Sequence, residues 1–352
     1  MTTRLSLLSL TPLVMALLSL IGCDRATQPP DSARSSSQSN ATQPTDEQAN
    51  QSQRLVTLAP ALTKMVKDLG AADRLVGVAK NDAVAPAEVP IVGTYNNINT
   101  EALLHASPTH VLMITAKQQV PQRLRTMADR GRFKLVTYPY PRQIEAIGRI
   151  LHHPTKTSAK AQSAKTRPAT GANGDGQNTP ARHPPGIGQV LNRADKAAEL
   201  KHQLYARLER LKNLTRDWPK PKVLLVINPR SMLVTGPGSV NHQLLKYVSA
   251  RNAAGDAPIP AISLNREALL AKQPEAIVLL DPGSPPLTEG DGRLASFRGL
   301  SIPAVQRDRI ALLNDPLILL PSTNLPQTAE ALAKAIHPDR RDAIEQAMQS
   351  AE

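Results

Sequence analysis

The chain has 352 residues, of which 41% are hydrophobic and only 2% aromatic, and its formal net charge is +13. This length exceeds that of one ordinary domain, so we expect two lobes whose cores consist of Leu, Val, Ile and Ala. The positive charge raises nucleic acid as a partner, but no helix-turn-helix, zinc finger or alternation of aromatic and basic residues is present, so nucleic-acid binding is not predicted.

The N-terminal segment 1–23, MTTRLSLLSLTPLVMALLSLIGC, combines one Arg, an apolar stretch and a small residue before Cys23. The apolar stretch is short for a membrane span and lacks a charged stop, which is typical of an export signal. Its last four residues also resemble the lipobox of bacterial lipoproteins, in which the Cys is acylated. We therefore predict a lipid anchor at Cys23, on the periplasmic or extracytoplasmic face of the cell envelope. The alternatives are a buried thiol or an uncleaved anchor helix.

Two polar stretches, 24–53 and 153–188, are rich in Ser, Thr, Gln, Lys and Pro and show no apolar period. Because they have little apolar surface to bury, they cannot offset the entropy of ordering. The first is predicted to be a disordered tether and the second a disordered basic insertion. Much of the positive charge lies in and near the insertion, at residues such as Lys156 and Arg182.

Between and after these stretches, apolar runs alternate with segments of helical spacing. Strands are predicted over 54–58, 74–78, 109–114, 133–138, 222–227, 276–280 and 309–314. Helices are predicted over 61–70, 102–105, 241–249 and 325–336. This alternation is typical of an α/β fold, with central parallel sheets in two lobes. We assign the lobes to 54–141 and 219–338 and a C-terminal tail to 339–352.

The segment 142–218 connects the two lobes. Its apolar residues Leu200, Leu204, Leu208 and Leu211 follow one another at spacings of three and four. This pattern predicts one long backbone helix of about seven turns, enough to reach both lobes at about 1.5 Å per residue. The basic insertion interrupts it.

One phrase occurs in both lobes, as TEALLHASPTHVLMI over 100–114 and as REALLAKQPEAIVLL over 266–280. Each copy begins with a Glu in a short helical pattern, which Pro108 or Pro274 stops because proline cannot continue a helix. An apolar run then predicts a buried strand. The repeated phrase therefore predicts the same unit in both lobes, a short helix followed by a buried strand.

Five segments resemble, in order, the substrate-binding proteins of ABC importers for cobalamin, haem and iron-siderophores, which have a helical backbone between two lobes. They cover most of 54–338 and read RLVTLAPALTKMVKDLGAADRLVGVAKND, VGTYNNINTEALLHASPTHVLM, MLVTGPGSVNHQLLKYVSARN, LNREALLAKQPEAIVLLDPG and VQRDRIALLNDPLILLPS. The resemblance implies a metal chelate bound between the lobes and delivery to an ABC permease dimer. It also implies that Glu101 and Glu267 pair with permease arginines. Alternatively, each Glu only favours the positive end of its helix.

Candidate ligand contacts follow from the rule that ligands lie beyond the carboxyl ends of parallel strands. The residues so placed are Ala59, Pro60 and Ala61 in the first lobe and Gly236, Gly238, Asn314 and Asp315 in the second. The resemblance adds Tyr95, where cobalamin-binding relatives place a ring; it either stacks on a macrocycle or is an ordinary loop residue. Lys80 and Lys117 also follow strands, and they either meet ligand carboxylates or are simply exposed.

The sequence lacks several common catalytic and metal-binding motifs. There is no P-loop, no GxGxxG or GxSxG pattern, and no pair of histidines at ligand spacing with a carboxylate nearby. We therefore predict no enzyme activity, no cofactor and no bare-metal site. Because aromatic residues are scarce, the ligand is either cobalamin, a polar siderophore or another chelate. Loss of the transport function is a further alternative. The alternative function is an envelope interaction lipoprotein that keeps the fold and binds an acidic polymer through its insertion.

Overall fold

The computed structural model describes residues 53–94, 96–153 and 184–349. In the first lobe, the described strands form a four-stranded parallel sheet in the order β2-β1-β3-β4. The strands are β1 (Leu55–Thr57), β2 (Leu75–Val78), β3 (His110–Ile114) and β4 (Lys134–Tyr138). The helices are α2 (Pro60–Asp68), α3 (Thr100–His105) and α4 (Gln122–Asp129). This lobe confirms the predicted parallel α/β organisation.

The second lobe has a mixed sheet in the order β10-β9-β5-β6-β8, with β7 paired to β5. Its strands are β5 (Lys222–Asn228), β6 (Leu233–Thr235), β7 (Arg251–Asn252), β8 (Ala261–Ser263), β9 (Ala276–Leu280) and β10 (Ile310–Leu313). Its helices are α8 (Val240–Leu244), α9 (Arg266–Lys272), α10 (Pro303–Gln306), α11 (Leu325–Ile336) and α12 (Arg341–Gln349). The predicted parallel core is present in β5, β9 and β10, whereas β6 runs antiparallel to both of its neighbours, β5 and β8. Neither β6 nor β8, which have three residues each, was predicted from the sequence.

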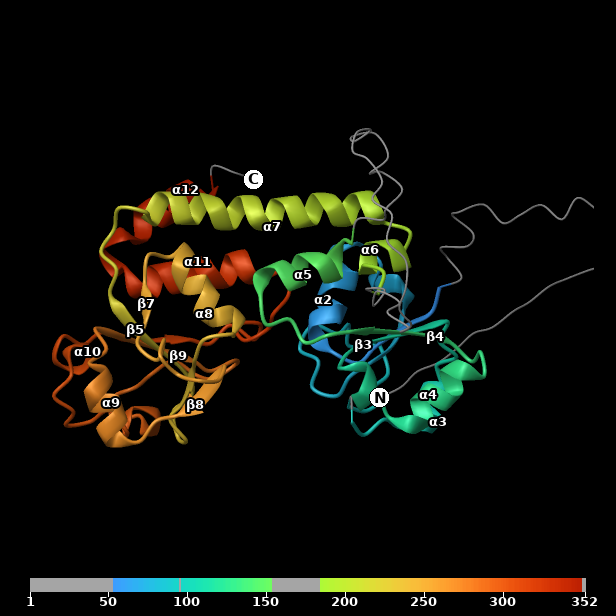
Figure 1. Ribbon diagram of the computed structural model, residues 1–352, viewed down its shortest axis with the longest axis horizontal. Coiled ribbons are helices and arrows are strands. Elements are labelled where there is room, and N and C mark those ends of the chain that lie inside the picture. The colour runs from blue at the N-terminus through green and yellow to red at the C-terminus, as the bar shows by residue number, and fades with distance from the viewer. Residues whose placement is uncertain (1–52, 95, 154–183, 350–352) are drawn as a thin grey trace, which may run out of the picture. The chain divides into compact units, whose positions relative to one another are not determined.

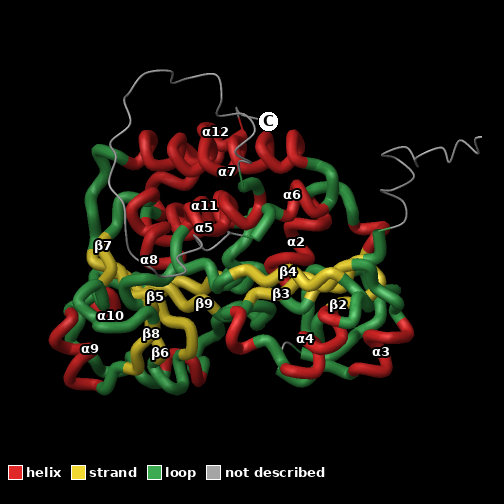
Figure 2. Tube along the Cα trace, turned by 45° about the vertical axis from the view of Figure 1, so that its right-hand side comes forward, coloured by secondary structure: helices red, strands yellow, loops and turns green. Residues whose placement is uncertain are grey.

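The segment between the lobes forms α5 (Ile144–Leu151), α6 (Ile187–Val190) and α7 (Ala194–Thr215). With 22 residues, α7 is about 33 Å long and packs on α5 and α6 as well as on α11 and α12 (Figures 1 and 2). The predicted long backbone helix is thereby confirmed. The helical pattern before the insertion belongs to a separate helix, α5, which packs beside α7 instead of continuing it.

Three predicted boundaries differ from the structure. Ile187 and Gly188, assigned to the insertion, begin α6, and Ile187 is fully buried. Gln53, assigned to the tether, donates to the carbonyl oxygen of Val190 at 2.9 Å. The predicted C-terminal tail contains α12, whose apolar face is buried. In each case a few apolar or amide side chains contact residues that are distant in sequence. Local sequence patterns cannot predict such contacts.

Successive residues of a strand belong to different cores, because their side chains point to opposite faces of the sheet. Val223 of β5 belongs to the large core beneath α7, whereas Leu224 belongs to a smaller core covered by α9 and α10. In β1, Leu55 points to the large core and Val56 to a core covered by α3 and α4. The faces away from α7 are therefore separate in the two lobes.

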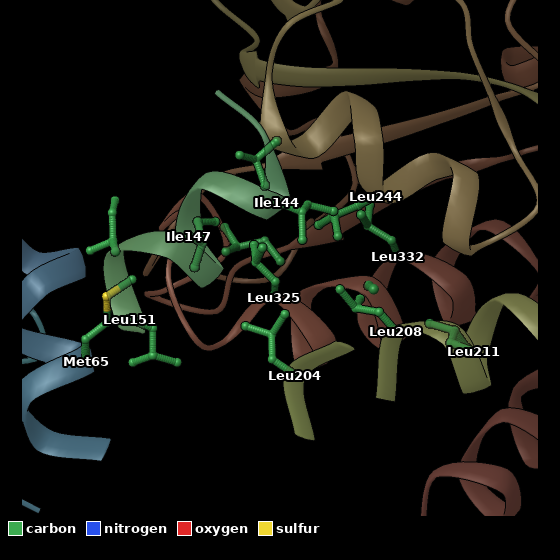
Figure 3. Packing of buried hydrophobic residues seen from close by; sticks show 14 of the residues in the cluster. Met65, Ile144, Ile147, Leu151, Leu204, Leu208, Leu211, Leu244, Leu325 and Leu332 are labelled. Atoms are coloured by element: carbon green, nitrogen blue, oxygen red, sulfur yellow. The ribbon is translucent and has the colours of Figure 1, made fainter. Parts of the chain in front are cut away.

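The core beneath α7 is common to both lobes. It combines buried side chains of α2, α5, α6, α7, α8, α11 and α12 with one face of each sheet. Figure 3 shows Ile144, Ile147 and Leu151 of α5 between Met65 of α2 and Leu325 of α11. Because one apolar layer runs through both lobes, exposing either half to water would cost much of its burial energy.

Candidate functional site

The carboxyl ends of strands from both lobes border a cavity of about 310 Å³. The first lobe contributes Tyr140, Pro141 and Arg142, which follow β4, and the second contributes residues at the ends of β5 and β6. The second-lobe lining is Ile227, Thr235, Gly238, Ser239, Val240, Asn241, Pro260, Ala261, Leu319 and Pro321. A largely apolar wall with a few polar groups, at this volume, is typical of a small-molecule site.

Tyr140 is the most prominent side chain at this cavity. It is 65% exposed, and it is the only aromatic residue among the described residues that line the cavity. Arg142, two residues further, is also exposed. An aromatic face next to a guanidinium can stack on a flat ligand and bind its carboxylate. Sequence analysis missed both residues, although the rule for strand carboxyl ends, applied to β4, would have identified them.

The turn around Gly236 forms part of the cavity wall. Gly236 donates its backbone N–H to the Pro260 carbonyl oxygen at 2.8 Å, and a Cβ there would lie 2.2 Å from the Ile259 carbonyl oxygen. Gly238 lines the cavity with a φ of 79°. Ser239 then caps α8 by accepting the His242 N–H at 3.2 Å. Of the two predicted glycines, Gly238 therefore lines the cavity, whereas Gly236 does not line it and allows the turn to approach Ile259 closely.

We expect Gly236→Ala to destabilise the protein by about 1–3 kcal/mol, because the segment that carries Ile259 must move away from the new methyl group. Urea unfolding followed by circular dichroism measures the change. Gly292→Ala is the matched control, since no heavy atom lies within 4 Å of the Cβ that it would add. Equal effects of the two substitutions would contradict the close approach as the reason for glycine at position 236.

The other ligand contacts predicted in the first lobe lie in different environments. Ala59 and Pro60 are half-buried at the start of α2, but Ala61 is buried and its carbonyl oxygen accepts from Ser322 Oγ at 2.8 Å. Ala61 therefore belongs to the contact between the lobes. Lys80 and Lys117 are exposed and do not line the cavity beside Tyr140. Tyr95 and Cys23 lie outside the described residues.

Asn314 and Asp315 organise the loops that follow β9 and β10. Asn314 Nδ2 donates to the Ser284 carbonyl oxygen at 2.8 Å, and Asp315 Oδ1 accepts the Leu317 N–H at 2.7 Å. Asp315 also lines a smaller cavity of about 200 Å³ with Lys64 of α2. The structure does not bring Asn314 or Asp315 to the cavity that contains Tyr140.

Arg293 holds together the loop that follows β9. Its guanidinium donates to Asp291 at 2.6 Å, to Ser284 Oγ at 2.9 Å and to the Pro285 carbonyl oxygen at 2.9 Å. The hydrogen bonds from Arg293 lower the pKa of Asp291 from 3.8 to about 2. A carboxyl whose pKa is depressed on folding stabilises the fold above its unfolded pKa and loses this contribution as pH falls through the folded value.

We therefore expect the amide protons of 281–293 to keep constant protection down to about pH 3.8 and to lose it as pH approaches about 2. Hydrogen exchange, corrected for intrinsic rates, measures this protection. Asp291→Asn imitates protonation and should expose the same amides at neutral pH, whereas Glu289→Gln, an exposed charge in the same loop, should not. Unchanged protection in Asp291→Asn would contradict this role of the ion pair.

The repeated phrase occupies equivalent places in the two lobes. Glu101 and Glu267 are exposed in the first turns of α3 and α9, and the side chains of Asn99 and Asn265 cap these helices. The caps, which sequence analysis did not identify, accept backbone N–H groups that the helices leave free. Both helices cover sheet faces away from α7, as Figures 1 and 2 also show.

In the residues that the structure describes, no three or more His, Cys, Asp or Glu side chains gather in a group that could hold a metal ion. None of their helices has the length and apolar character needed to cross a membrane.

Comparison with known proteins agrees with this architecture. An "Uncharacterized ABC transporter substrate-binding lipoprotein YvrC" of Bacillus subtilis is 24% identical over 93% of this chain and 96% of its own length. A "Vitamin B12-binding protein" of Pectobacterium carotovorum is 23% identical over 66% of this chain and 72% of its own. A periplasmic haem-binding protein from Pseudomonas aeruginosa shares the fold, with a TM-score of 0.60, 23% identity and coverage of 81% and 93% of the two chains.

The family comparison covers most of the described structure. The model described as "Periplasmic binding protein" matches residues 55–167 and 186–317, which include both sheets, α7 and the residues that line the cavity at Tyr140, apart from Leu319 and Pro321. The match thus contains the sequence repeat and most of both lobes, whereas α11 and α12 lie beyond it. The chain belongs to the periplasmic binding protein family.

Proposed function

We propose that this chain is the substrate receptor of an ABC importer and that it captures a metal chelate, such as cobalamin, haem or a ferric siderophore, between its lobes. The cavity at the carboxyl ends of strands from both lobes is the observation that carries the proposal. Family membership and relatives named for vitamin B12 and haem support the choice of ligand class.

Tyr140 and Arg142 define the chemistry that the receptor would recognise. A flat, conjugated ligand would gain contact with the exposed ring of Tyr140, and an acidic substituent would pair with Arg142. The other lining residues are mainly apolar, with Thr235, Ser239 and Asn241 as hydrogen-bonding groups. This combination favours a planar, carboxylated chelate such as haem over a strongly polar one.

We place the receptor at the outer face of a membrane, held by a lipid on Cys23, and expect it to deliver its cargo to a permease dimer. The sequence around Cys23 and a relative named as a lipoprotein support the anchor. Glu101 and Glu267 would supply equivalent contacts to the two halves of the permease, because α3 and α9 begin in the same way and cover corresponding faces.

Absorbance titration of the purified protein with haem, cobalamin and ferric siderophores tests the ligand. We expect one of them to bind saturably, and Tyr140→Ala to weaken that binding about tenfold, because the lost ring contact corresponds to about 1.4 kcal/mol. Tyr140→Phe keeps the ring and is the matched control. Absence of binding by every chelate, or equal affinity of wild type and Tyr140→Ala, would contradict the proposed site.

Deleting 154–183 separates this proposal from the interaction lipoprotein predicted as the alternative. The deletion stops before Ile187, whose buried side chain belongs to α6. A receptor should bind its chelate with unchanged affinity after this deletion. A protein that binds an acidic polymer through the insertion should instead lose that partner and show no chelate binding.

A further inference from the structure

A second cavity, of about 460 Å³, lies at the opposite edge of the second sheet. Its lining residues precede the parallel strands: Lys220 comes before β5, Arg251 begins β7, and Arg307 and Arg309 precede β10. The cavity at Tyr140 instead contains residues at the carboxyl ends of β5 and β6. Because β5 has seven residues, about 20 Å of strand separates the two edges.

The charges around this cavity are strongly unbalanced. Five cationic side chains line it, and only two carboxylates, Glu275 and Asp339, do so. Glu275 is engaged, since its Oε2 accepts the backbone N–H of Lys222 at 2.7 Å. The cations are Lys220, Arg251, Arg307, Arg309 and Arg340. Across the described residues, none of them forms an ion pair.

Hydrogen bonds to backbone carbonyl oxygens account for only part of this charge. Arg309 donates to the carbonyl oxygen of Ile336 at the end of α11, and Arg251 donates to the Lys220 carbonyl oxygen at 3.1 Å. The side chains of Lys220 and Arg307 are exposed and make no hydrogen bond within the part of the chain that the structure describes. At least these two charges have no structural partner, and mutual repulsion makes their gathering unfavourable without an anion.

Two aromatic residues stand beside the cations. The Arg340 guanidinium lies 5.8 Å from the centroid of the Trp218 ring, and the buried His337, which lines the cavity, lies edge-on to the same ring at 5.2 Å. Burial lowers the pKa of His337, and the charges of Arg309 and Arg340 lower it further, against a hydrogen bond to Val248 that raises it. The two guanidiniums therefore create a positive electrostatic potential at the imidazole.

We infer that this cavity binds the phosphate group of an anionic ligand. Four guanidiniums present planar, paired N–H donors that match phosphate oxygens, and one ammonium adds a point charge. The volume accommodates a diphosphate or a phosphate with a small substituent. The site is independent of the cleft between the lobes, so its occupation does not require bound chelate.

Trp218 is the only tryptophan of the chain and reports directly on this site. We expect sodium pyrophosphate to change the Trp218 fluorescence of the purified full-length chain saturably, and calorimetry to give the same affinity. Lys220→Gln/Arg307→Gln should weaken binding at least about tenfold, since it removes two charges that make no hydrogen bond or ion pair with the described part of the chain. Arg123→Gln/Arg130→Gln, which removes two exposed charges at α4, should leave the affinity unchanged.

The inference is overturned if neither fluorescence nor heat saturates, if sodium chloride at equal ionic strength has the same effect, or if the Lys220/Arg307 variant keeps wild-type affinity. Two further probes identify the source of the phosphate. Tight binding of glycerophosphoglycerol, a soluble phosphodiester, assigns the site to a lipid headgroup. Binding of pyrophosphate and inorganic phosphate without the phosphodiester assigns it to free phosphates.

Discussion

Replacing Glu101 and Glu267 together by Lys is expected to reduce chelate uptake by cells at least about tenfold while the affinity of the purified receptor stays unchanged. Both carboxylates are exposed at the first turns of α3 and α9, and neither lines the cavity at Tyr140. The substitution would turn two attractions to permease arginines into two repulsions. Each single substitution should have an intermediate effect, since the contacts are equivalent.

The matched control reverses the same number of charges on α7. Glu199 and Glu209 are exposed there, on the helix that covers the opposite faces of the sheets. Glu199→Lys/Glu209→Lys should leave uptake close to that of the wild type. If it lowers uptake as much as the variant at Glu101 and Glu267, or if the latter transports normally, α3 and α9 are not the docking elements and their glutamates only favour the helix N-termini.

Leu208→Ala is expected to lower the free energy of unfolding by about 2–5 kcal/mol, which corresponds to a decrease of about 5–15 °C in the melting temperature. Leu208 is fully buried on α7, in the core that both lobes share, and Figure 3 labels it together with Leu204, Leu211 and Leu332. Its truncation leaves a cavity that rigid helices on either side cannot fill. Scanning calorimetry measures the change.

The same experiment tests whether the lobes unfold together. Because the core beneath α7 contains residues of both sheets, the variant should shift one transition without splitting it. Leu104→Ala is the control, because Leu104 is 49% exposed on α3, and it should change stability by less than about 0.5 kcal/mol. Two separate transitions in the wild type would contradict a shared core.

Several elements were predictable because their information is local. The helix over 325–336 was predicted with the bounds that α11 has, since a Pro in its first turn and an apolar face determine it. The strands β3 and β9 follow from the two copies of the repeated phrase, in which a Pro ends the helical pattern and a buried run follows. Such patterns can be recognised without knowing which segment packs against the helix or strand.

The candidate site was predicted less well. Gly238 lines the cavity at Tyr140, but Ala61 is engaged with Ser322, and Asn314 and Asp315 organise loops beside it. Tyr140 was missed because an exposed ring after a strand has no distinctive pattern in the sequence. Its importance depends on which second-lobe residues lie opposite, and these extend from Ile227 to Pro321, far along the chain from Tyr140.

The α/β class, the long backbone helix and the two helices that begin with a Glu could be predicted from local patterns, because periodicity, proline placement and repetition are properties of short segments. Three features became visible only in the folded chain: one apolar layer joins the lobes, Tyr140 and Arg142 border the cavity, and cations from four separate segments gather at the far edge of the second sheet. These features arise from packing between distant segments. The free energy that selects them is spread over many contacts, none of which is encoded near its partner.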